Sequence, residues 1–342
     1  DLALDRMTAN GHLSLEQARS LRSEGVPVRI FKPLPPPNDY FVEEIKQRLL
    51  DDERLGETAQ ERYNAVFRGG LKIYSTLDRR MQGQAEAKRD EVLPSKITDG
   101  RFTSALVSLE PSTGYVRAMV AGDDFAHAKY NLATQGRRQP GSSFKPYVLL
   151  AALEEGYGPN DMIDGTSPCT IKVPGSKPYT PGNYEGSSGG VMSLTDATAR
   201  SVNCAYARLG VTVGLDKVVN MAARLGLPRN RLEAYPSVSL GAEEATPLEM
   251  AAAYGAVAND GVYHAPRFYE RVVDRNGKAV LEGPERGRRV ISAQTARMAI
   301  QVMRAVVEKG TGTRARLPGR DVAGKTGTSQ EHENAWFVGF TP

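Results

Sequence analysis

The sequence contains few of the residues that commonly bind metal ions. Its 342 residues include two cysteines, neither in a Cys-x-x-Cys or Cys/His ligand spacing, and four histidines that lie far apart. These histidines are His12, His127, His264 and His332. We therefore expect no metal ion, and no feature of the sequence predicts another cofactor. Cys169 and Cys204 allow at most one disulfide bridge, and their number alone does not identify the redox compartment.

The sequence also lacks a strong charge bias and long hydrophobic runs. Lys and Arg number 44 against 40 Asp and Glu, a net charge of +4, and the basic residues are scattered. Charge therefore gives no support for nucleic-acid binding. No run of about 18 apolar residues is present, and no charged-then-apolar leader opens the chain. Because the chain begins with Asp, we expect it to be a piece of a longer protein whose membrane segment lies elsewhere.

The composition is that of a globular chain long enough for about two domains, with 40% hydrophobic and 25% charged residues. Residues 2–24 are predicted to be helical, with a turn at Asn10-Gly11. A proline-rich connector at residues 33–38 predicts a boundary near residue 38. Beyond it, residues 40–50 repeat apolar side chains at helical spacing, and residues 71–77 alternate as a strand does before a polar helix from Asp78.

From residue 104 onward, the pattern alternates between strands and buried helices. The expected elements are a hairpin over 105–120, a fully buried helix over 147–153, a helix over 247–259, a hairpin over 272–280 with an Asn-Gly turn, and a strand over 334–340.

Ser142 is the only serine in the chain that is followed by lysine at the third position. Positions three apart share one face of a helix, so the Ser142 hydroxyl and the Lys145 amine are expected to meet. A serine hydroxyl becomes a good nucleophile when a base takes its proton, and a lysine kept neutral by burial can be that base. Taken alone, the pair is a weak signal, because a helix that begins with capping serines and carries a solvated lysine explains it better.

Two further motifs change this balance. Ser201-Val202-Asn203 is the only Ser-x-Asn in the chain, and Lys325-Thr326-Gly327 is the only Lys-Thr-Gly. Separately, these motifs are ordinary as a helix cap and a polar turn. All three motifs in this order are the signature of active-site serine enzymes that react with penicillin.

The neighbourhoods of these motifs resemble class A penicillin-binding proteins. The similar segments are 138–146, 324–329 and 335–342, the linker-like segment 70–78, and residues 1–30, which resemble the tail of a glycosyltransferase domain. Asn334 departs from the Asp that this family usually has. The resemblance implies an α+β fold of the penicillin-binding transpeptidase and serine β-lactamase type, with an antiparallel sheet flanked by helices. It divides the chain into a glycosyltransferase tail with connector (1–38), a linker module (39–100) and a transpeptidase domain (101–342).

The resemblance also implies a site and a reaction. The substrate is the D-alanyl-D-alanine end of a peptidoglycan stem peptide, and β-lactams are inhibitors. Ser142 is the nucleophile, Lys145 its base and Ser201 a proton relay, while Asn203 holds the substrate amide. Lys325, Thr326 and Thr328 hold the terminal carboxylate, and Gly327 belongs to the same substrate-binding segment. The backbone N–H groups of Ser142 and Thr328 form the oxyanion hole, and the parent works outside the cytoplasm at the cell membrane, within a cell-wall synthesis complex.

Three other functions fit part of the sequence. A β-lactamase or D,D-carboxypeptidase of the same fold has the same three motifs, and a β-lactam sensor or scaffold without catalysis has the same fold. Residues 319–326 also match the nucleotide-binding P-loop pattern, but no hydrophobic strand precedes them.

The family pattern extends beyond both ends of this chain. It places the glycosyltransferase carboxylates before residue 1, and a further sheet strand and a terminal helix after residue 342. We therefore expect residues 1–342 alone to leave strand edges unpaired and to bind penicillin weakly.

Overall fold

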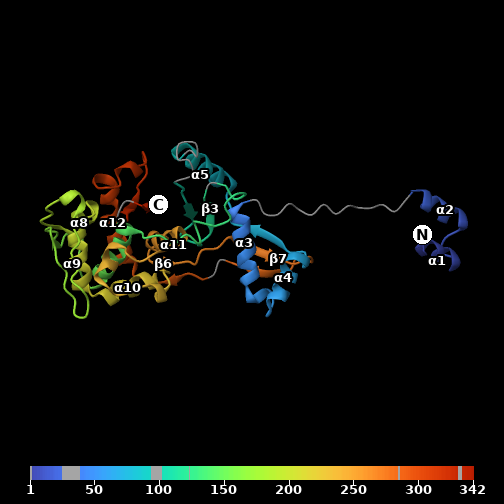
Figure 1. Cartoon of the computed structure of the whole chain (residues 1–342), viewed down its shortest axis with the longest axis horizontal. Coiled ribbons are helices and arrows are strands. Elements are labelled where there is room, and N and C mark those ends of the chain that lie inside the picture. Colours follow the sequence, from blue (N-terminus) through green and yellow to red (C-terminus); the bar gives the residue numbers. More distant parts are fainter. Residues whose placement is uncertain (1, 25–38, 94–101, 123, 284–285, 330–332) are drawn as a thin grey trace. The chain divides into compact units, whose positions relative to one another are not determined.

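The computed structural model describes residues 2–24, 39–93, 102–122, 124–283, 286–329 and 333–342. The chain divides into two compact units, Asp1–Pro37 and Asn38–Pro342. In the first, α1 (Leu2–Ala9) and α2 (Leu15–Glu24) confirm the predicted helices (Figure 1). They are separated by a turn in which Gly11 has a positive φ. The predicted connector at 33–38 lies outside the described residues.

The second unit begins with α3 (Tyr40–Asp51), whose first turn is capped by Asp39 through a 2.7 Å bond from Val42 N. Its buried side chains are Tyr40, Phe41, Ile45 and Leu49. This confirms the predicted apolar stripe. The next elements are η1 (Glu53–Leu55), α4 (Ala59–Arg68), β1 (Lys72–Ser75) and α5 (Arg79–Val92).

These N-terminal elements pack directly on later parts of the chain. Strand β1 pairs with β7 (Tyr269–Val273), which pairs in turn with β8 (Ala279–Glu282). The apolar stripe of α3 packs with residues of β3 and β7 in one hydrophobic cluster. In Figure 1, α3, α4 and β7 lie together at one end of this unit, and α8, α9, α10 and α12 lie toward the other. The predicted hairpin over 272–280 is thus present and extends the sheet that β1 begins.

The remaining residues form small antiparallel sheets packed against helices. The other strands are β2 (Leu106–Leu109), β3 (Val116–Val120), β4 (Met162–Asp164), β5 (Val191–Ser193), β6 (Val262–Tyr263), β9 (Arg288–Arg289), β10 (Ala323–Thr328) and β11 (Ala335–Phe340). Among the described strands, they pair as β2–β3, β4–β5, β6–β9 and β10–β11. The fold is therefore α+β, as predicted, with its antiparallel strands in separate small sheets.

Helix α7 (Lys145–Glu154) is the centre of the main hydrophobic core. Every residue from Lys145 to Leu153 is buried, which confirms the predicted buried helix. The other helices that contribute buried residues to this core are α8 (Leu194–Ala199), α9 (Asn203–Val213), α10 (Leu215–Arg224), α11 (Pro247–Ala258) and α12 (Ala293–Lys309). None of the described helices has both the length and the apolar character needed to cross a bilayer.

Candidate active site

Ser142 lies in a single 3-10 turn, Gly141–Phe144, that leads directly into α7. Lys145 is the first residue of α7, so both residues stand at the same end of this buried helix. Ser142 is partly exposed, whereas Lys145 is fully buried. The nucleophile candidate therefore faces accessible space, and the base candidate is removed from water.

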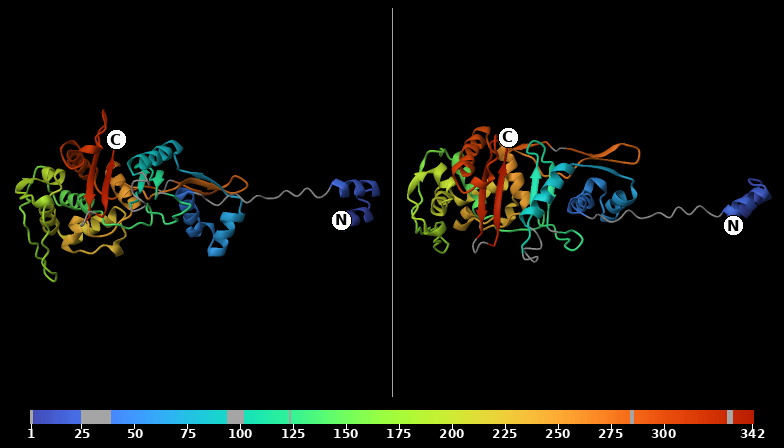
Figure 2. Two further views of the ribbon diagram at one scale, coloured as in Figure 1. Left: turned by 45° about the horizontal axis from the view of Figure 1, so that its top comes forward. Right: turned by 90° about the horizontal axis from the view of Figure 1, so that it is seen from above.

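Strand β10 packs against this turn with no room for side chains between the two backbones. A Cβ on Gly141, whose φ is +52°, would lie 2.2 Å from Thr328 O. A Cβ on Gly327 would lie 2.2 Å from Pro140 O and 2.9 Å from Ser143 Oγ. The Lys-Thr-Gly segment therefore lies immediately beside the Ser142 turn. Figure 2 shows β10 and β11 as a pair of strands near the C-terminus.

Ser201 and Asn203 flank the junction between two helices. Helix α8 ends at Ala199 and α9 begins at Asn203, and Ser201 between them has a left-handed φ of 57°. A residue other than glycine rarely adopts this conformation, and such strain is found most often at functional sites. It turns the chain sharply, so that Ser201 and Asn203 both face Lys145.

The lysine side chains join the three motifs into one hydrogen-bonded cluster. Lys145 Nζ donates to Ser201 O at 2.7 Å, to Asn203 Oδ1 at 2.7 Å and to Ser201 Oγ at 3.2 Å. Lys325 Nζ donates to the same Ser201 Oγ at 2.8 Å and to Thr326 O at 3.1 Å. Residues far apart in the sequence are thus brought together around one hydroxyl group.

Both lysines are buried, and neither is ion-paired with a described carboxylate. The pKa of Lys145 lies well below its ordinary value. Burial is the larger cause, and the charge of Lys325 is the second. Burial lowers the pKa of Lys325 to about 7. A neutral lysine amine has a free lone pair and can accept a proton. The electrostatics of the cluster therefore favour Lys145 as a base and leave Lys325 close to its titration point at neutral pH.

The predicted contact between Ser142 and Lys145 is absent. Within the described chain, the Ser142 hydroxyl makes no hydrogen bond, and the Lys145 amine is turned toward Ser201 and Asn203. Side chains three apart lie above one another in a 3-10 turn, so the turn itself does not separate Ser142 from Lys145. The Lys145 amine is held away by its tertiary partners on Ser201 and Asn203. Catalytic hydrogen bonds are often long in the absence of substrate, so this geometry does not exclude Lys145 as a base.

The backbone around Ser142 and Thr328 leaves two N–H donors available. The N–H of Ser142, at the start of the 3-10 turn, donates to no acceptor in the described residues. Ser329 N donates to Asn334 O at 3.0 Å, and in an antiparallel pair hydrogen-bonded residues alternate with non-bonded ones. Thr328, which is opposite Ala335, therefore directs its N–H away from β11 and toward Gly141.

Lys325 lies within β10, paired with Val338 of β11. A nucleotide-binding P-loop requires its lysine at the start of a helix, with backbone N–H groups around a phosphate. The P-loop interpretation of residues 319–326 is therefore wrong.

Thr326 is held by Thr311, with their hydroxyl oxygens 2.6 Å apart.

Four residues of the site have no motif in the sequence that identifies them. Thr311 contacts Thr326, and the ring of Tyr206 lies 5.5 Å from Lys145 Nζ. Tyr254 donates to Ser143 O at 2.6 Å, next to the nucleophile candidate. Asn183 contacts the first turn of α9. Each acts through tertiary contacts, which no local pattern encodes.

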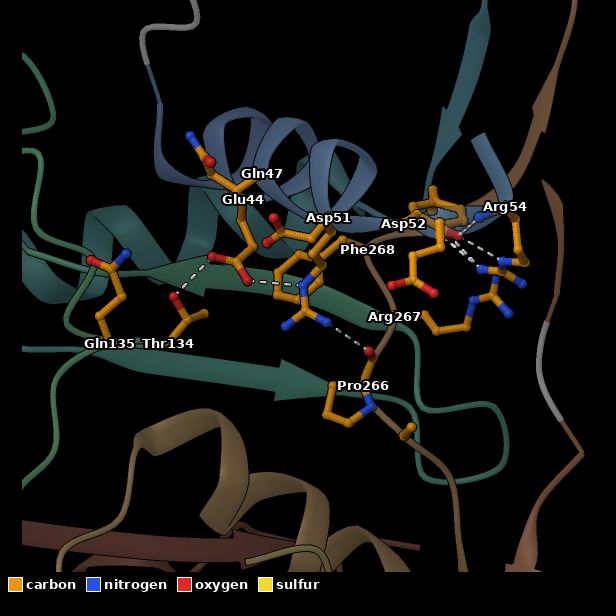
Figure 3. A pocket seen from close by; sticks show the side chains of 14 residues that line it. Glu44, Gln47, Asp51, Asp52, Arg54, Thr134, Gln135, Pro266, Arg267 and Phe268 are labelled. Carbon is orange, nitrogen blue, oxygen red and sulfur yellow. Dashed lines mark hydrogen bonds and ion pairs between the residues drawn. The ribbon is translucent and has the colours of Figure 1, made fainter. Parts of the chain in front are cut away.

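A cavity of about 780 Å³ lies elsewhere, where α3 meets residues 134–135 and 265–269 (Figure 3). Glu44 lines the cavity and accepts hydrogen bonds from Thr134 Oγ1 at 2.9 Å and Arg48 Nε at 2.8 Å. The guanidinium of Arg48 covers the ring of Phe268 at 4.6 Å. These acidic and basic side chains pair with each other, and none of the motif residues lines the cavity. It is therefore not part of the candidate active site.

The fold and this cluster place the chain among the serine enzymes that react with penicillin, and the comparison with known families agrees. Residues 104–342 match the family model described as the penicillin binding protein transpeptidase domain, and the chain belongs to this family. Penicillin-binding protein 1A of Aquifex aeolicus (strain VF5) is 36% identical over 254 residues, which are 74% of this chain and 34% of that protein. The resemblance to class A penicillin-binding proteins is thus confirmed, and the chain spans about a third of the length of the curated relatives it matches.

Solved structures share the fold. Penicillin-binding protein 1A from Haemophilus influenzae aligns with a TM-score of 0.77 at 22% identity, covering 99% of this chain and 69% of that one. The PonA1 protein from Mycobacterium tuberculosis, solved in complex with penicillin V, aligns with a TM-score of 0.73 at 28% identity, covering 88% of this chain and 81% of that one.

Proposed function

We propose that the protein is a serine D,D-transpeptidase that cross-links peptidoglycan stem peptides through an acyl-enzyme on Ser142. The observation that carries this proposal is the pair of hydrogen bonds from Lys145 and Lys325 to Ser201 Oγ, at 3.2 and 2.8 Å. They join the three motifs beside the Ser142 turn, as a shared proton-transfer network requires.

In the proposed reaction, Ser142 Oγ attacks the carbonyl of the penultimate D-alanine while the neutral amine of Lys145 takes the hydroxyl proton. The N–H groups of Ser142 and Thr328 donate to the oxyanion of the tetrahedral intermediate. When the intermediate collapses, the peptide bond breaks, and Ser201 passes a proton from the lysine cluster to the departing D-alanine amine. The product is an ester between the substrate and Ser142.

The same groups account for substrate binding. A terminal carboxylate is held best by a cation together with hydroxyl donors in a partly desolvated groove. Lys325, Thr326 and Thr328 are such a set, on a strand whose Gly327 allows close approach to the Ser142 turn. Asn203 holds the substrate amide. An amine from a second stem peptide then attacks the ester, forms the cross-link and frees Ser142.

β-Lactams are expected to acylate Ser142 by the same attack, because their strained amide is in the place of the scissile peptide bond. The penicillin V complex of PonA1, a protein 28% identical to this chain, supports this extension. A β-lactamase or D,D-carboxypeptidase would pass the acyl group to water instead. The family match favours transfer to an amine.

The wider assignments concern the whole protein. We propose that residues 1–38 are the tail of a glycosyltransferase domain with its connector, that 39–100 form a linker module and that 101–342 form the transpeptidase domain. We also propose a membrane segment outside this chain, a place in a cell-wall synthesis complex and a location outside the cytoplasm. The bridge between Cys169 and Cys204 supports this location, because disulfides persist in oxidising compartments.

Product analysis with the full-length protein tests the reaction. A stem peptide that ends in D-alanyl-D-alanine is supplied with an amine acceptor, and released D-alanine, cross-linked peptide and hydrolysed peptide are measured. Transpeptidation predicts that cross-linked product accounts for most of the released D-alanine. Hydrolysed peptide as the main product at saturating acceptor would instead assign a carboxypeptidase.

A further inference from the structure

A long connection beside the proposed active site has only one short helical turn of its own. It joins β4 to β5 across residues 165–190 and includes η3 (Tyr184–Gly186). The bridge from Cys169 to Cys204 ties it to the first turn of α9. Cys204 directly follows Asn203, which accepts a hydrogen bond from Lys145. The bridge therefore attaches the connection next to a residue of the candidate active site.

Asn183 is the polar centre of this connection, and the residue is 8% exposed. Its Nδ2 donates to Gly165 O at 2.9 Å and to Ser187 O at 3.1 Å, so it ties the start of the connection to its later part. Its Oδ1 accepts from Cys204 N at 3.0 Å. One buried amide therefore joins the connection to itself and to α9.

Helix α9 needs this acceptor. The first N–H groups of a helix have no partner inside the helix, and the residue before it usually supplies a side-chain oxygen. That residue is Val202, which makes no side-chain cap hydrogen bond. Asn183, distant in the sequence, supplies the missing oxygen to Cys204 N.

The neighbour of Asn183 fixes the orientation of Asn203. Gly182 O accepts from Asn203 Nδ2 at 2.8 Å, and Asn203 Oδ1 accepts from Lys145 Nζ at 2.7 Å. The amide of Asn203 is thus held at both ends, which directs its oxygen at Lys145. The position of the Gly182 carbonyl depends in turn on Asn183, the next residue.

We propose that Asn183 is a positioning residue of the active site, which holds Gly182 so that Asn203 presents its oxygen to Lys145. The inference rests on the proposed function. Loss of the Asn183 amide releases the Gly182 carbonyl, leaves the Asn203 amide free to rotate and removes an acceptor from Lys145. Misplacement of a catalytic group by about 1 Å costs on the order of 100-fold in rate.

The test uses the full-length protein with Asn183→Ala and measures the acylation rate constant with a fluorescent penicillin from pH 5 to 10. We expect acylation to slow by roughly 10- to 100-fold. An acceptor favours the protonated amine, so its loss lowers the pKa of Lys145 and moves the rising limb of the pH profile to lower pH. Among the described residues, the titratable groups that face Lys145 are Lys325 from β10 and Tyr206 from α9, and the variant changes neither.

Asn131→Ala is the matched control, because Asn131 is also a buried asparagine, 5% exposed, with side-chain bonds to the backbone. The Asn131→Ala variant should be less stable than the parent, and the rising limb of its pH profile of acylation should not move. A second variant, Asn183→Ala with Val202→Thr, gives α9 a local cap oxygen and restores the fold if Asn183→Ala alone is too unstable. Val202→Thr alone provides its baseline.

The outcomes separate the two claims. Acylation that stays slow in the recapped variant, with the limb displaced, supports a positioning role. Parental rate and limb in Asn183→Ala, or recovery of both on recapping, would overturn it, because Asn183 would then be only a helix cap. Acylation that persists in Ser142→Ala would instead refute the proposed function, whatever Asn183→Ala does.

Discussion

Lys325 Nζ donates a hydrogen bond of 2.8 Å to Ser201 Oγ, although the two residues belong to a strand and a helix junction far apart in the sequence. Ser201 has a left-handed φ of 57°, so the junction is strained where the contact forms. This contact connects β10 with the turn before α9, and Lys145 reaches the same hydroxyl from α7. The cluster is therefore formed by three separate elements.

Lys145→Met removes the proposed base and keeps much of the buried volume. Loss of a general base typically slows a reaction by about 10²- to 10⁴-fold. We expect a loss of this size in the acylation rate constant with a fluorescent penicillin. Lys278→Met, in the exposed turn between β7 and β8, is the control and should acylate at the parental rate. Equal rates in both variants would show that Lys145 is not the base.

Lys325 makes the stability of the protein depend on pH. Its pKa is about 7 in the folded protein against an ordinary lysine value of 10.5, so between these pH values Lys325 binds more protons in the unfolded chain. The contribution of Lys325 to the free energy of unfolding therefore rises with pH across this window. Lys325→Met lacks this contribution. Denaturant unfolding at pH 7 and pH 9.5 should show a larger gain for the parent than for the variant, and equal gains would contradict the buried, deprotonating lysine.

Gly327→Ala tests the close packing of β10 on the Ser142 turn. The new Cβ would meet the backbone oxygen of Pro140 at 2.2 Å, so the strand must shift. We expect a destabilisation of about 1–3 kcal/mol, the usual cost of overpacking, together with loss of acylation. Gly83→Ala on α5 meets no atom within 4 Å and should stabilise the protein by roughly 0.5–1 kcal/mol. Unfolding curves and labelling gels measure both effects, and a silent Gly327→Ala would be inconsistent with this packing.

The bridge between Cys169 and Cys204 closes a loop with a sequence separation of 35. The chain-entropy model gives about 3–4 kcal/mol for such a loop. The double variant Cys169→Ala, Cys204→Ala should lose stability of this order in denaturant unfolding. Reductant should destabilise the parent and leave the double variant unchanged. Equal sensitivity to reductant in both would mean that the bridge is not formed.

Much of the fold follows from local patterns. The stripe that contains Phe41 and Ile45 predicted α3, and the Asn276-Gly277 turn predicted the hairpin of β7 and β8, because spacing and turn chemistry depend on neighbouring residues. The site residues were found in the same way, since Ser142, Lys145 and Lys325 belong to short motifs. The convergence of Lys325 with the other two was inferred only through the family resemblance.

The contacts within the site could not be predicted. The left-handed φ of Ser201 and the cap that Asn183 provides to α9 arise from long-range packing. The periodicity of the sequence carries no information about such packing. The expected hydrogen bond between Ser142 and Lys145 fails for the same reason. Lys145 donates instead to Asn203 Oδ1 and to the backbone oxygen of Ser201. No residue near Lys145 in the sequence indicates these partners.

The most direct measurement is the location of the penicillin adduct in the full-length protein by peptide mass spectrometry. We expect an adduct on Ser142, none in Ser142→Ala, and a normal adduct in Ser143→Ala, because Ser143 is buried and donates to Pro140 O. An adduct on another residue, or one that survives in Ser142→Ala, would contradict the assignment of the nucleophile.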